Sequence, residues 1–350
     1  MALQHTSFQK KNKSRIPYIP GTKPSIQNAQ LLGSSGIPSL DYVIGGGVPV
    51  GTILLIEEDK YGSYAKLVAK YFLSEGIVCG HSVLAASQDV DCQTLVHELP
   101  APIKPEDSTS TNEGDKMTIA WRYQNLRTVE SSPTNTAFGH NFDLTKYIED
   151  DVLKKSDVSL WSGCVDKLEN KGGFSNPSFL DLLCKIHCKL KEGQFGISAN
   201  PEKRNLMRIA VLSLGSPLWA PTESDLARFC YCLRALVRSA YAICLITVPS
   251  HLYQNESIVK RCEHLCDISV RLESFAGSEK ETNPVYKDYH GLFHINKLSA
   301  INTLAPHIPE SIDLAFKLKR RKFLIEKLHL PPELQESVQR EQDDLASGVL

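Results

Sequence analysis

The sequence predicts an α/β fold in which helices flank a mostly parallel central β-sheet. Residues 53–56 form a β-branched apolar run, a helical pattern begins at Ser63, and residues 77–86 form a second apolar run. Two strands joined through one helix are parallel when they share a sheet, because the helix carries the chain back across that sheet. Apolar runs at residues 208–219 and 241–248, separated by another helical pattern, extend the same sheet.

Residues that favour helix ends bracket three helical segments. The expected boundaries are Ser63 and Gly76 for the first helix, Asn176 with Pro177 and Gly193 for the second, and Thr222 with Asp225 at the start of the third. Further strands are expected at residues 268–272 and in a hairpin around residues 290–291.

The distribution of charge and apolar residues predicts one domain with two tails. Residues 1–30 contain five Lys or Arg and no acidic residue, which is typical of a disordered basic arm. Residues 31–330 are expected to form a single domain, with a flexible insertion around residues 101–116, a segment rich in Pro, Ser and Thr. Residues 331–350 carry five acidic residues and one Arg, and we expect an acidic disordered tail.

Composition narrows the class of protein. No apolar run approaches the roughly 20 residues that cross a bilayer, so no membrane association is expected. Ten cysteines without a framework spacing indicate reduced thiols in the cytosol or nucleus. Cys230-x-Cys232 and Cys262-x-His264-x-Cys266 lack the paired spacing of a zinc or cluster site. We therefore expect buried thiols, a solvated His264 and no metal.

A glycine-rich block precedes the first strand. Residues 36–56, GIPSLDYVIGGGVPVGTILLI, place a short helix capped by Ser39 before the turn formed by Gly45, Gly46 and Gly47, and Gly51 then opens the strand. This block resembles the opening of RecA-like ATPases of the recombinase type. The resemblance implies a RecA-like fold in which the strand leads into a phosphate loop.

The segment that follows lacks the residues of a working phosphate loop. An active loop reads G-x-x-x-x-G-K-[ST], with backbone N–H groups around the phosphates. Here the corresponding positions form a degenerate phosphate loop: Glu58, Asp59, Lys60, Tyr61, Gly62, Ser63, Tyr64 and Ala65. The second apolar strand should end in the acidic residue that holds Mg²⁺, but it ends in Ser213-Leu214-Gly215-Ser216. Ser213 and Gly215 thus mark a degenerate Walker B position, and we expect no catalytic residue.

Four segments together are similar to the fourth subunit of the Elongator complex: residues 19–25, 36–52, 56–76 and 213–219. The resemblance covers most of residues 19–334. It implies a heterohexameric RecA-like ring with the fifth and sixth subunits, which docks on the catalytic part of Elongator and binds tRNA. Such a ring supports modification of the wobble uridine at its fifth carbon, in cytoplasm and nucleus. No cofactor is implied for this subunit, because the chemistry lies in another one, and any ATP hydrolysis would belong to the assembled ring.

A basic cluster near the C-terminus is the other candidate site. Its residues, which alternate with apolar ones as on a strand or helix with one basic side, are Lys317, Lys319, Arg320, Arg321 and Lys322. The pattern is compatible with three interpretations: the cluster contacts tRNA phosphates, it serves nuclear import, or it is solvated surface.

Three alternatives to an assembly and tRNA-binding subunit remain open. The first is an active ATPase in which Lys60 replaces the missing lysine. The second is a recombination-type, DNA-binding RecA paralogue, which the absence of an intact phosphate loop disfavours. The third is a scaffold with no nucleic-acid role.

Overall fold

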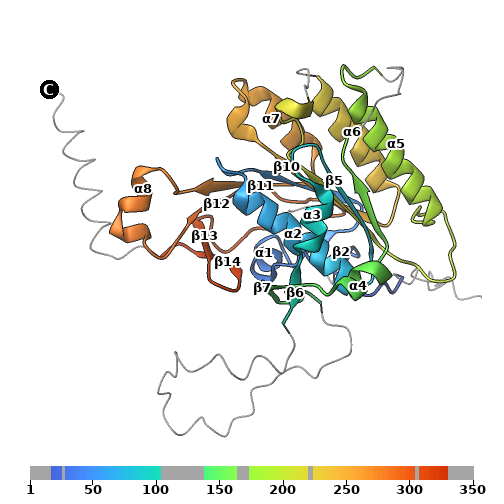
Figure 1. Cartoon of the computed structure of the whole chain (residues 1–350), viewed down its shortest axis with the longest axis horizontal. Coiled ribbons are helices and arrows are strands. Elements are labelled where there is room, and N and C mark those ends of the chain that lie inside the picture. Colours follow the sequence, from blue (N-terminus) through green and yellow to red (C-terminus); the bar gives the residue numbers. More distant parts are fainter. Residues whose placement is uncertain are drawn as a thin grey trace, which may run out of the picture.

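A nine-stranded sheet crosses the centre of the computed structural model, which describes residues 17–25, 28–103, 138–163, 173–219, 224–303 and 307–329 (Figure 1). The strands lie in the order β14-β13-β12-β11-β4-β10-β9-β5-β8. Their bounds are β4 (Thr52–Glu57), β5 (Ser82–Ser87), β8 (Val158–Trp161), β9 (Met207–Leu212), β10 (Ala242–Val248), β11 (Ile268–Ser274), β12 (Gly291–Lys297), β13 (Leu314–Leu318) and β14 (Phe323–Lys327).

The predicted mostly parallel sheet is confirmed. Every pairing from β11 through β4, β10, β9 and β5 to β8 is parallel. The pairings β11–β12, β12–β13 and β13–β14 are antiparallel, so the last three strands form a meander on one edge. Strand β4 is therefore central, with a parallel neighbour on each side.

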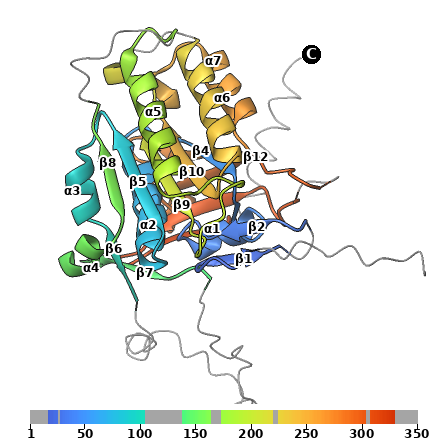
Figure 2. The ribbon, with the colours of Figure 1, turned by 90° about the vertical axis from the view of Figure 1, so that its right-hand side faces the viewer.

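Helices cover both faces of the sheet, as Figure 2 shows from the side. The helices of the described residues are α1 (Pro38–Val43), α2 (Ser63–Val78), α3 (Cys92–His97), α4 (Asp150–Lys155), α5 (Pro177–Glu192), α6 (Asp225–Arg238), α7 (Glu256–Leu265) and α8 (Glu279–Thr282). Within β4, Leu54 and Ile56 join the core on the α1–α2–α3 face, whereas Ile53 and Leu55 join the core under α5, α6 and α7. This alternation follows the two-residue period of a strand, and both faces of β4 are buried.

Two small sheets flank the main one. β1 (Thr22–Pro24), β2 (Leu31–Gly33) and β3 (Val48–Pro49) are antiparallel, and β6 (Pro100–Pro102) pairs with β7 (Phe142–Tyr147). Strand β1 and the fully buried Ile19 lie inside the segment for which we expected a disordered arm, so ordered chain begins before Leu31. The first residues of the expected 101–116 insertion belong to β6, whereas residues 104–137 and the tail 331–350 lie outside the described residues.

Several predicted helix ends are confirmed and others are wrong. The Asn176 side chain accepts a hydrogen bond from the Ser178 N–H with Pro177 in the first turn, as predicted. Helix α2 does not end at Gly76 but continues to Val78, and β5 starts only at Ser82. The N-cap position of α2 is Gly62, so Ser63 is its first residue and not its cap. Thr222 lies outside the described residues, and α6 begins at Asp225.

The glycine turn after α1 has the backbone conformation predicted for it. Gly45, Gly46 and Gly47 have φ angles of 95°, 105° and 135°, where L side chains are strained. A Cβ atom at Gly47 would lie 2.8 Å from the Gly33 carbonyl oxygen, so this position also needs glycine for space. The predicted role of Ser39 as a cap is wrong, because the N-cap position of α1 is Ile37. The Ser39 hydroxyl instead accepts a hydrogen bond from the Ile325 N–H of the edge strand β14, at 3.0 Å.

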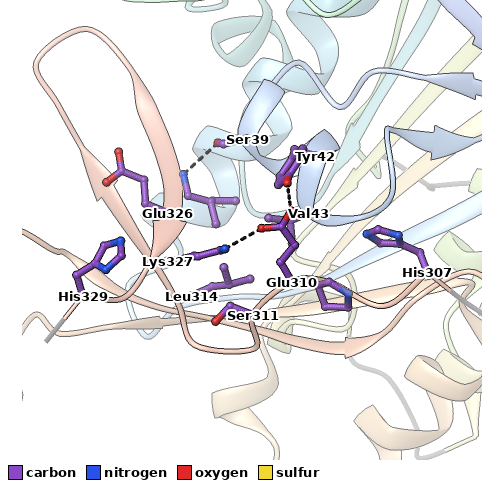
Figure 3. A pocket seen from close by; sticks show the side chains of 12 residues that line it. Ser39, Tyr42, Val43, His307, Glu310, Ser311, Leu314, Glu326, Lys327 and His329 are labelled. Atoms are coloured by element: carbon purple, nitrogen blue, oxygen red, sulfur yellow. Dashed lines mark hydrogen bonds and ion pairs between the residues drawn. The ribbon is translucent and has the colours of Figure 1, made fainter. Parts of the chain in front are cut away.

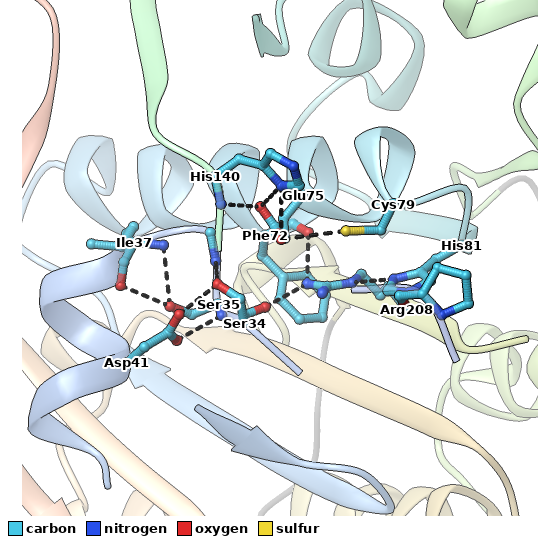
Figure 4. Close-up of polar contacts among 12 residues, drawn as sticks. Ser34, Ser35, Ile37, Asp41, Phe72, Glu75, Cys79, His81, His140 and Arg208 are labelled. Atoms are coloured by element: carbon cyan, nitrogen blue, oxygen red, sulfur yellow. Dashed lines mark hydrogen bonds and ion pairs between the residues drawn. The ribbon is translucent and has the colours of Figure 1, made fainter. Parts of the chain in front are cut away.

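A buried arginine joins β9 to the N-terminal half of the chain (Figure 4). Arg208 is fully buried and donates to the carbonyl oxygens of Ser34 (2.8 Å) and Phe72 (3.2 Å) and to Nδ1 of His81 (3.0 Å). Burial would raise the pKa of the nearby Glu75, but hydrogen bonds from His140 and the charge of Arg208 together hold it below its ordinary value. Glu75 is therefore an ionised carboxylate inside the protein.

No helix in the described part of the chain is long and apolar enough to span a bilayer.

Candidate functional site

The loop between β4 and α2 lies where strands of a parallel sheet end, the usual ligand position in such folds. Asp59, which is 2 % exposed, turns its carboxylate onto the first turn of α2. Its Oδ1 accepts hydrogen bonds from the N–H groups of Tyr64 (3.0 Å) and Ala65 (3.3 Å), and its Oδ2 accepts one from the Ser63 hydroxyl (3.4 Å). The amides that begin a helix bind anions. In this chain the anion is a side chain of the loop itself.

Glu58, also buried, points to the ends of the neighbouring strands. Its Oε1 accepts hydrogen bonds from the hydroxyls of Thr247 (2.5 Å) and Ser213 (3.0 Å). Burial raises the pKa of Glu58 above its ordinary value, the two hydroxyls oppose that shift, and the charges of Asp89 and Asp59 add to it. The fold thus joins the two predicted degenerate positions, the loop and the end of β9, by a direct hydrogen bond.

Backbone conformation shapes both turns. Gly62 has a φ of 65° and Gly215 a φ of 80°. Ser213 also has a positive φ, of 49°, although it is not glycine. Its N–H donates to the Thr247 hydroxyl at 2.7 Å, which fixes this turn against β10.

A cleft of about 640 Å³ opens beside the loop, between β4, β11 and α7. Glu57, at the end of β4, accepts a hydrogen bond from the Asn296 side chain at 2.5 Å. Burial, and then the hydrogen bond and charge of Glu57, raise the pKa of Glu263 on α7 to about 7. The proximity of Glu57 therefore makes ionisation of Glu263 in this cleft less favourable.

Two further loop side chains, Lys60 and Tyr64, differ in their exposure. Lys60 is exposed, and its Nζ lies 5.8 Å from the centre of the Tyr61 ring. The Tyr64 side chain is half-buried, and its ring packs 4.7 Å from that of Phe316. Tyr64 therefore serves the packing between α2 and the meander.

The basic cluster lies on the hairpin of β13 and β14, which resolves the choice between strand and helix. Lys317 pairs with Glu326 across the hairpin, and Arg321 lies 3.9 Å from the Asp143 carboxylate. The turn is closed by backbone hydrogen bonds between Lys319 and Lys322 (2.9 and 3.2 Å), and all four of its residues are exposed. The turn formed by residues 319–322 is therefore a compact basic protrusion, hereafter called the basic turn.

A second cavity, of about 480 Å³, lies between α1 and the same hairpin (Figure 3). Three of its polar side chains are paired with one another: Tyr42 donates to Glu310, and Lys327 forms an ion pair with Glu310 at 2.7 Å. The expectation for the thiols is confirmed in part, since Cys230, Cys262 and Cys266 are buried and His264 is exposed, whereas Cys232 is only half-buried.

Sequence reasoning missed three contributors to the site. Thr247 and Asn296 contact the loop carboxylates from strands more than 180 residues further along the chain. Asp59 was identified as a loop residue but not as the group that binds the first turn of α2. The available signal was weak: acidic side chains are stabilised near a helix N-terminus, but Asp59 lies four residues before the first residue of α2 and is not at its N-cap position.

The fold and the site define a mixed α/β protein whose central strand-to-helix loop holds its own carboxylates against the helix N-terminus. The family model of the PAXNEB protein matches residues 15–348. Among curated proteins, the chain is 44% identical to "Elongator complex protein 4" of Danio rerio, over 98% of this chain and 92% of that protein. It is 42% identical to the protein of that name from Homo sapiens, over 98% and 89%, and 24% identical to the one from Saccharomyces cerevisiae, over 89% and 76%. The chain belongs to the PAXNEB family, the family of Elongator complex protein 4.

Proposed function

We propose that this chain is a non-catalytic accessory subunit of Elongator, built on a RecA-like core that does not turn over ATP. The observation that carries the proposal is the contact between Asp59 and the first turn of α2. Those amides are the groups that a phosphate loop offers to a nucleotide. A phosphate placed about 4 Å from the carboxylate would be repelled by about 4 kcal/mol at an effective dielectric constant of 20.

A RecA-like core is supported by the placement of two strands. β4 leads through the loop into α2, and β9, the expected Walker B strand, ends at Leu212, directly before Ser213, whose hydroxyl donates to Glu58. Residues 213–216, which follow β9 in the described chain, include no acidic residue that could hold Mg²⁺. The acids nearby are Glu58 of the loop and Asp89, whose carboxylate accepts a hydrogen bond from Ser216 at 2.5 Å. The degenerate loop and the degenerate Walker B position are thus two parts of one altered site.

The partners follow from family membership and from the sequence segments that resemble the fourth Elongator subunit. We propose that the chain forms a heterohexameric ring with the fifth and sixth Elongator subunits, in cytoplasm and nucleus. The ring docks on the catalytic part of Elongator, binds tRNA and supports modification of the wobble uridine at its fifth carbon. The chain itself needs no cofactor for this role.

The basic turn is the best candidate on this chain for tRNA contact. Lys319, Arg320 and Lys322 are exposed at the tip of a hairpin, where phosphates can approach from several directions. Lys317 is less suited, because Glu326 neutralises it. Removing one lysine or arginine that binds a phosphate should lower the slope of log K against log salt by about 0.7–0.9.

Reconstitution with the fifth and sixth subunits tests the proposal. The assembled ring should bind tRNA, and replacing Lys319, Arg320 and Lys322 together by Glu should weaken binding and reduce the salt slope by about two. Glu at Lys154, Lys155 and Lys191, which are also exposed, changes the charge equally and serves as the control. Equal effects of both triple variants would remove the basic turn from the tRNA surface. Failure of the chain to assemble with either subunit would contradict the ring.

The same preparation separates this proposal from an active ATPase that uses Lys60. Lys60 is exposed and turned toward Tyr61, so Lys60→Ala should leave any hydrolysis by the ring unchanged. Loss of hydrolysis in that variant would favour the ATPase instead.

A further inference from the structure

A second group of polar side chains lies away from the degenerate loop, at the C-terminal end of α2 (Figure 4). Glu75, Cys79 and His140 each offer one donor atom, and these three atoms all lie within 4.8 Å of one another. Glu75 is completely buried, Cys79 is half-buried, and the His140 side chain is 27 % exposed. The proposed role in Elongator uses none of them.

The spacing of these residues is that of a metal site. Glu75 lies in the last turn of α2, and Cys79, four residues on, is the C-cap residue with helical backbone angles, so the two side chains leave the same face. His140 comes from the segment before β7 and closes the group from the other side. An i, i+4 pair on a helix with one ligand from elsewhere is a common way to build a zinc site.

The observed distances are close to those that a tetrahedral ion requires. His140 Nδ1 and Cys79 Sγ lie 3.2 Å and 3.4 Å from the same carboxylate oxygen, Oε1 of Glu75. With bonds of about 2.0–2.3 Å, tetrahedral ligand atoms are separated by roughly 3.3–3.6 Å. Small side-chain rotations, chiefly between Cys79 and His140, would therefore complete the geometry.

The nearby Arg208 is not hydrogen-bonded to the Glu75 carboxylate, which is held by the other two members of the group. Arg208 directs its hydrogen bonds to Ser34, Phe72 and His81, and none of the bonds found within the described residues runs from it to Glu75. The His140 backbone N–H donates to Glu75 Oε2 at 3.0 Å and holds that oxygen in place. The His140 side chain is 27 % exposed, so one member of the group is in contact with solvent, which can supply a water molecule as fourth ligand.

We propose that Glu75, Cys79 and His140 form a Zn²⁺ site that fastens the end of α2 to the segment leading into β7. Thiolate, imidazole and carboxylate together match zinc, whereas Mg²⁺ and Ca²⁺ prefer oxygen ligands alone. Binding releases the thiol proton of Cys79, and any proton on Nδ1 of His140, to solvent, and no electron transfer is involved.

Cobalt substitution tests the site on the full chain, alone and in the ring. After chelator treatment and removal of the chelator, one equivalent of Co²⁺ should give the thiolate charge-transfer band of a tetrahedral site, and Zn²⁺ should displace it. Cys79→Ser should abolish the band, and His140→Ala should weaken Co²⁺ binding by more than the roughly 10–100-fold that loss of an outer-shell partner costs. Cys184→Ser removes an exposed thiol on α5 and should leave the band intact.

Thermal unfolding provides a readout that does not depend on spectroscopy. Zn²⁺ should raise the Tm of the wild-type chain and of Cys184→Ser but not that of Cys79→Ser, since only a site present in the folded state is stabilised by its ligand. Circular dichroism of Cys79→Ser without metal confirms that the variant folds. Absence of the band in the wild-type chain, or an unchanged band in Cys79→Ser, would overturn the proposal.

Discussion

Replacement of Asp59 by Ala tests the central contact of the site by its effect on stability. In the folded protein the Asp59 carboxylate is 2 % exposed and accepts hydrogen bonds from the Tyr64 and Ala65 N–H groups and the Ser63 hydroxyl. Alanine leaves the two amides at the start of α2 without these partners. Loss of a cap costs about 0.5–2 kcal/mol, and hydrogen bonds to a charged acceptor contribute about 1.5–3 kcal/mol.

The opposing effect is smaller. Removing the charge of Asp59 relieves its repulsion of Glu58, which is part of what raises the pKa of Glu58. We therefore expect the free energy of unfolding to fall by about 2 kcal/mol, or the Tm to fall by about 4–8 °C. Urea unfolding at pH 7, followed by circular dichroism, measures this difference.

Asp91 supplies the matched control. It is the N-cap of α3 and accepts from the N–H groups of Gln93 and Thr94, as Asp59 does for α2, but it is exposed. Asp91→Ala should lower the free energy of unfolding by less than Asp59→Ala does, because at this exposed position water can accept the hydrogen bonds of the Gln93 and Thr94 N–H groups. A loss below about 0.5 kcal/mol for Asp59→Ala, or one no larger than that of Asp91→Ala, would show that the contact does not stabilise α2.

Three further predictions concern the neighbourhood of the site. Tyr71→Phe should destabilise the protein by about 1–3 kcal/mol, because the buried Phe323 N–H donates to the Tyr71 hydroxyl at 3.0 Å. Tyr42→Phe, at an exposed position, is the control, and equal urea midpoints for the two variants would refute this prediction. Thr247→Val should cost about 1–3 kcal/mol in the same assay, since Glu58 and the Ser213 N–H both lose a partner; an unchanged midpoint would contradict it. Glu263→Gln should change how stability depends on pH. The pKa of Glu263 is raised from 4.5 to about 7, so the folded state holds its proton longer than the unfolded state, and this group's contribution is lost as pH rises from 4.5 to 7. The free energy of unfolding of Glu263→Gln, relative to that of the wild type, should therefore be higher at pH 8 than at pH 4. The same difference at both pH values would refute the raised pKa of Glu263.

Periodicity made the central part of the fold predictable. The run at residues 53–56 is apolar on both faces, which fits a strand with parallel neighbours on each side, and β4 has that position. Helix α2 was predictable because apolar residues recur at helical spacing in the segment that begins at Ser63. Its end was not, because Gly76 resembles a terminating residue but lies inside α2, where a Cβ atom would come within 2.7 Å of Cδ of Arg208. Close packing, rather than helix termination, explains this glycine.

The candidate site was predictable only as a departure from a motif. The resemblance to RecA-like ATPases implies that Glu58, Asp59 and Tyr64 stand where phosphate-binding residues are expected, but not what each side chain contacts. Asp59 binds the helix, Glu58 binds strands β9 and β10 through hydroxyls, and Tyr64 packs on Phe316. These contacts join residues up to about 250 positions apart, and local sequence patterns carry no information about such pairs.

Equilibrium binding of MgATP to the purified chain tests most directly the claim that loop carboxylates have replaced the nucleotide. With Asp59 on the first turn of α2 and Glu58 at the end of β9, calorimetry should detect no saturable binding at millimolar nucleotide and no turnover by the chain alone. Micromolar binding of MgATP that is lost when residues 58–65 are altered, together with hydrolysis by the isolated chain, would contradict the account.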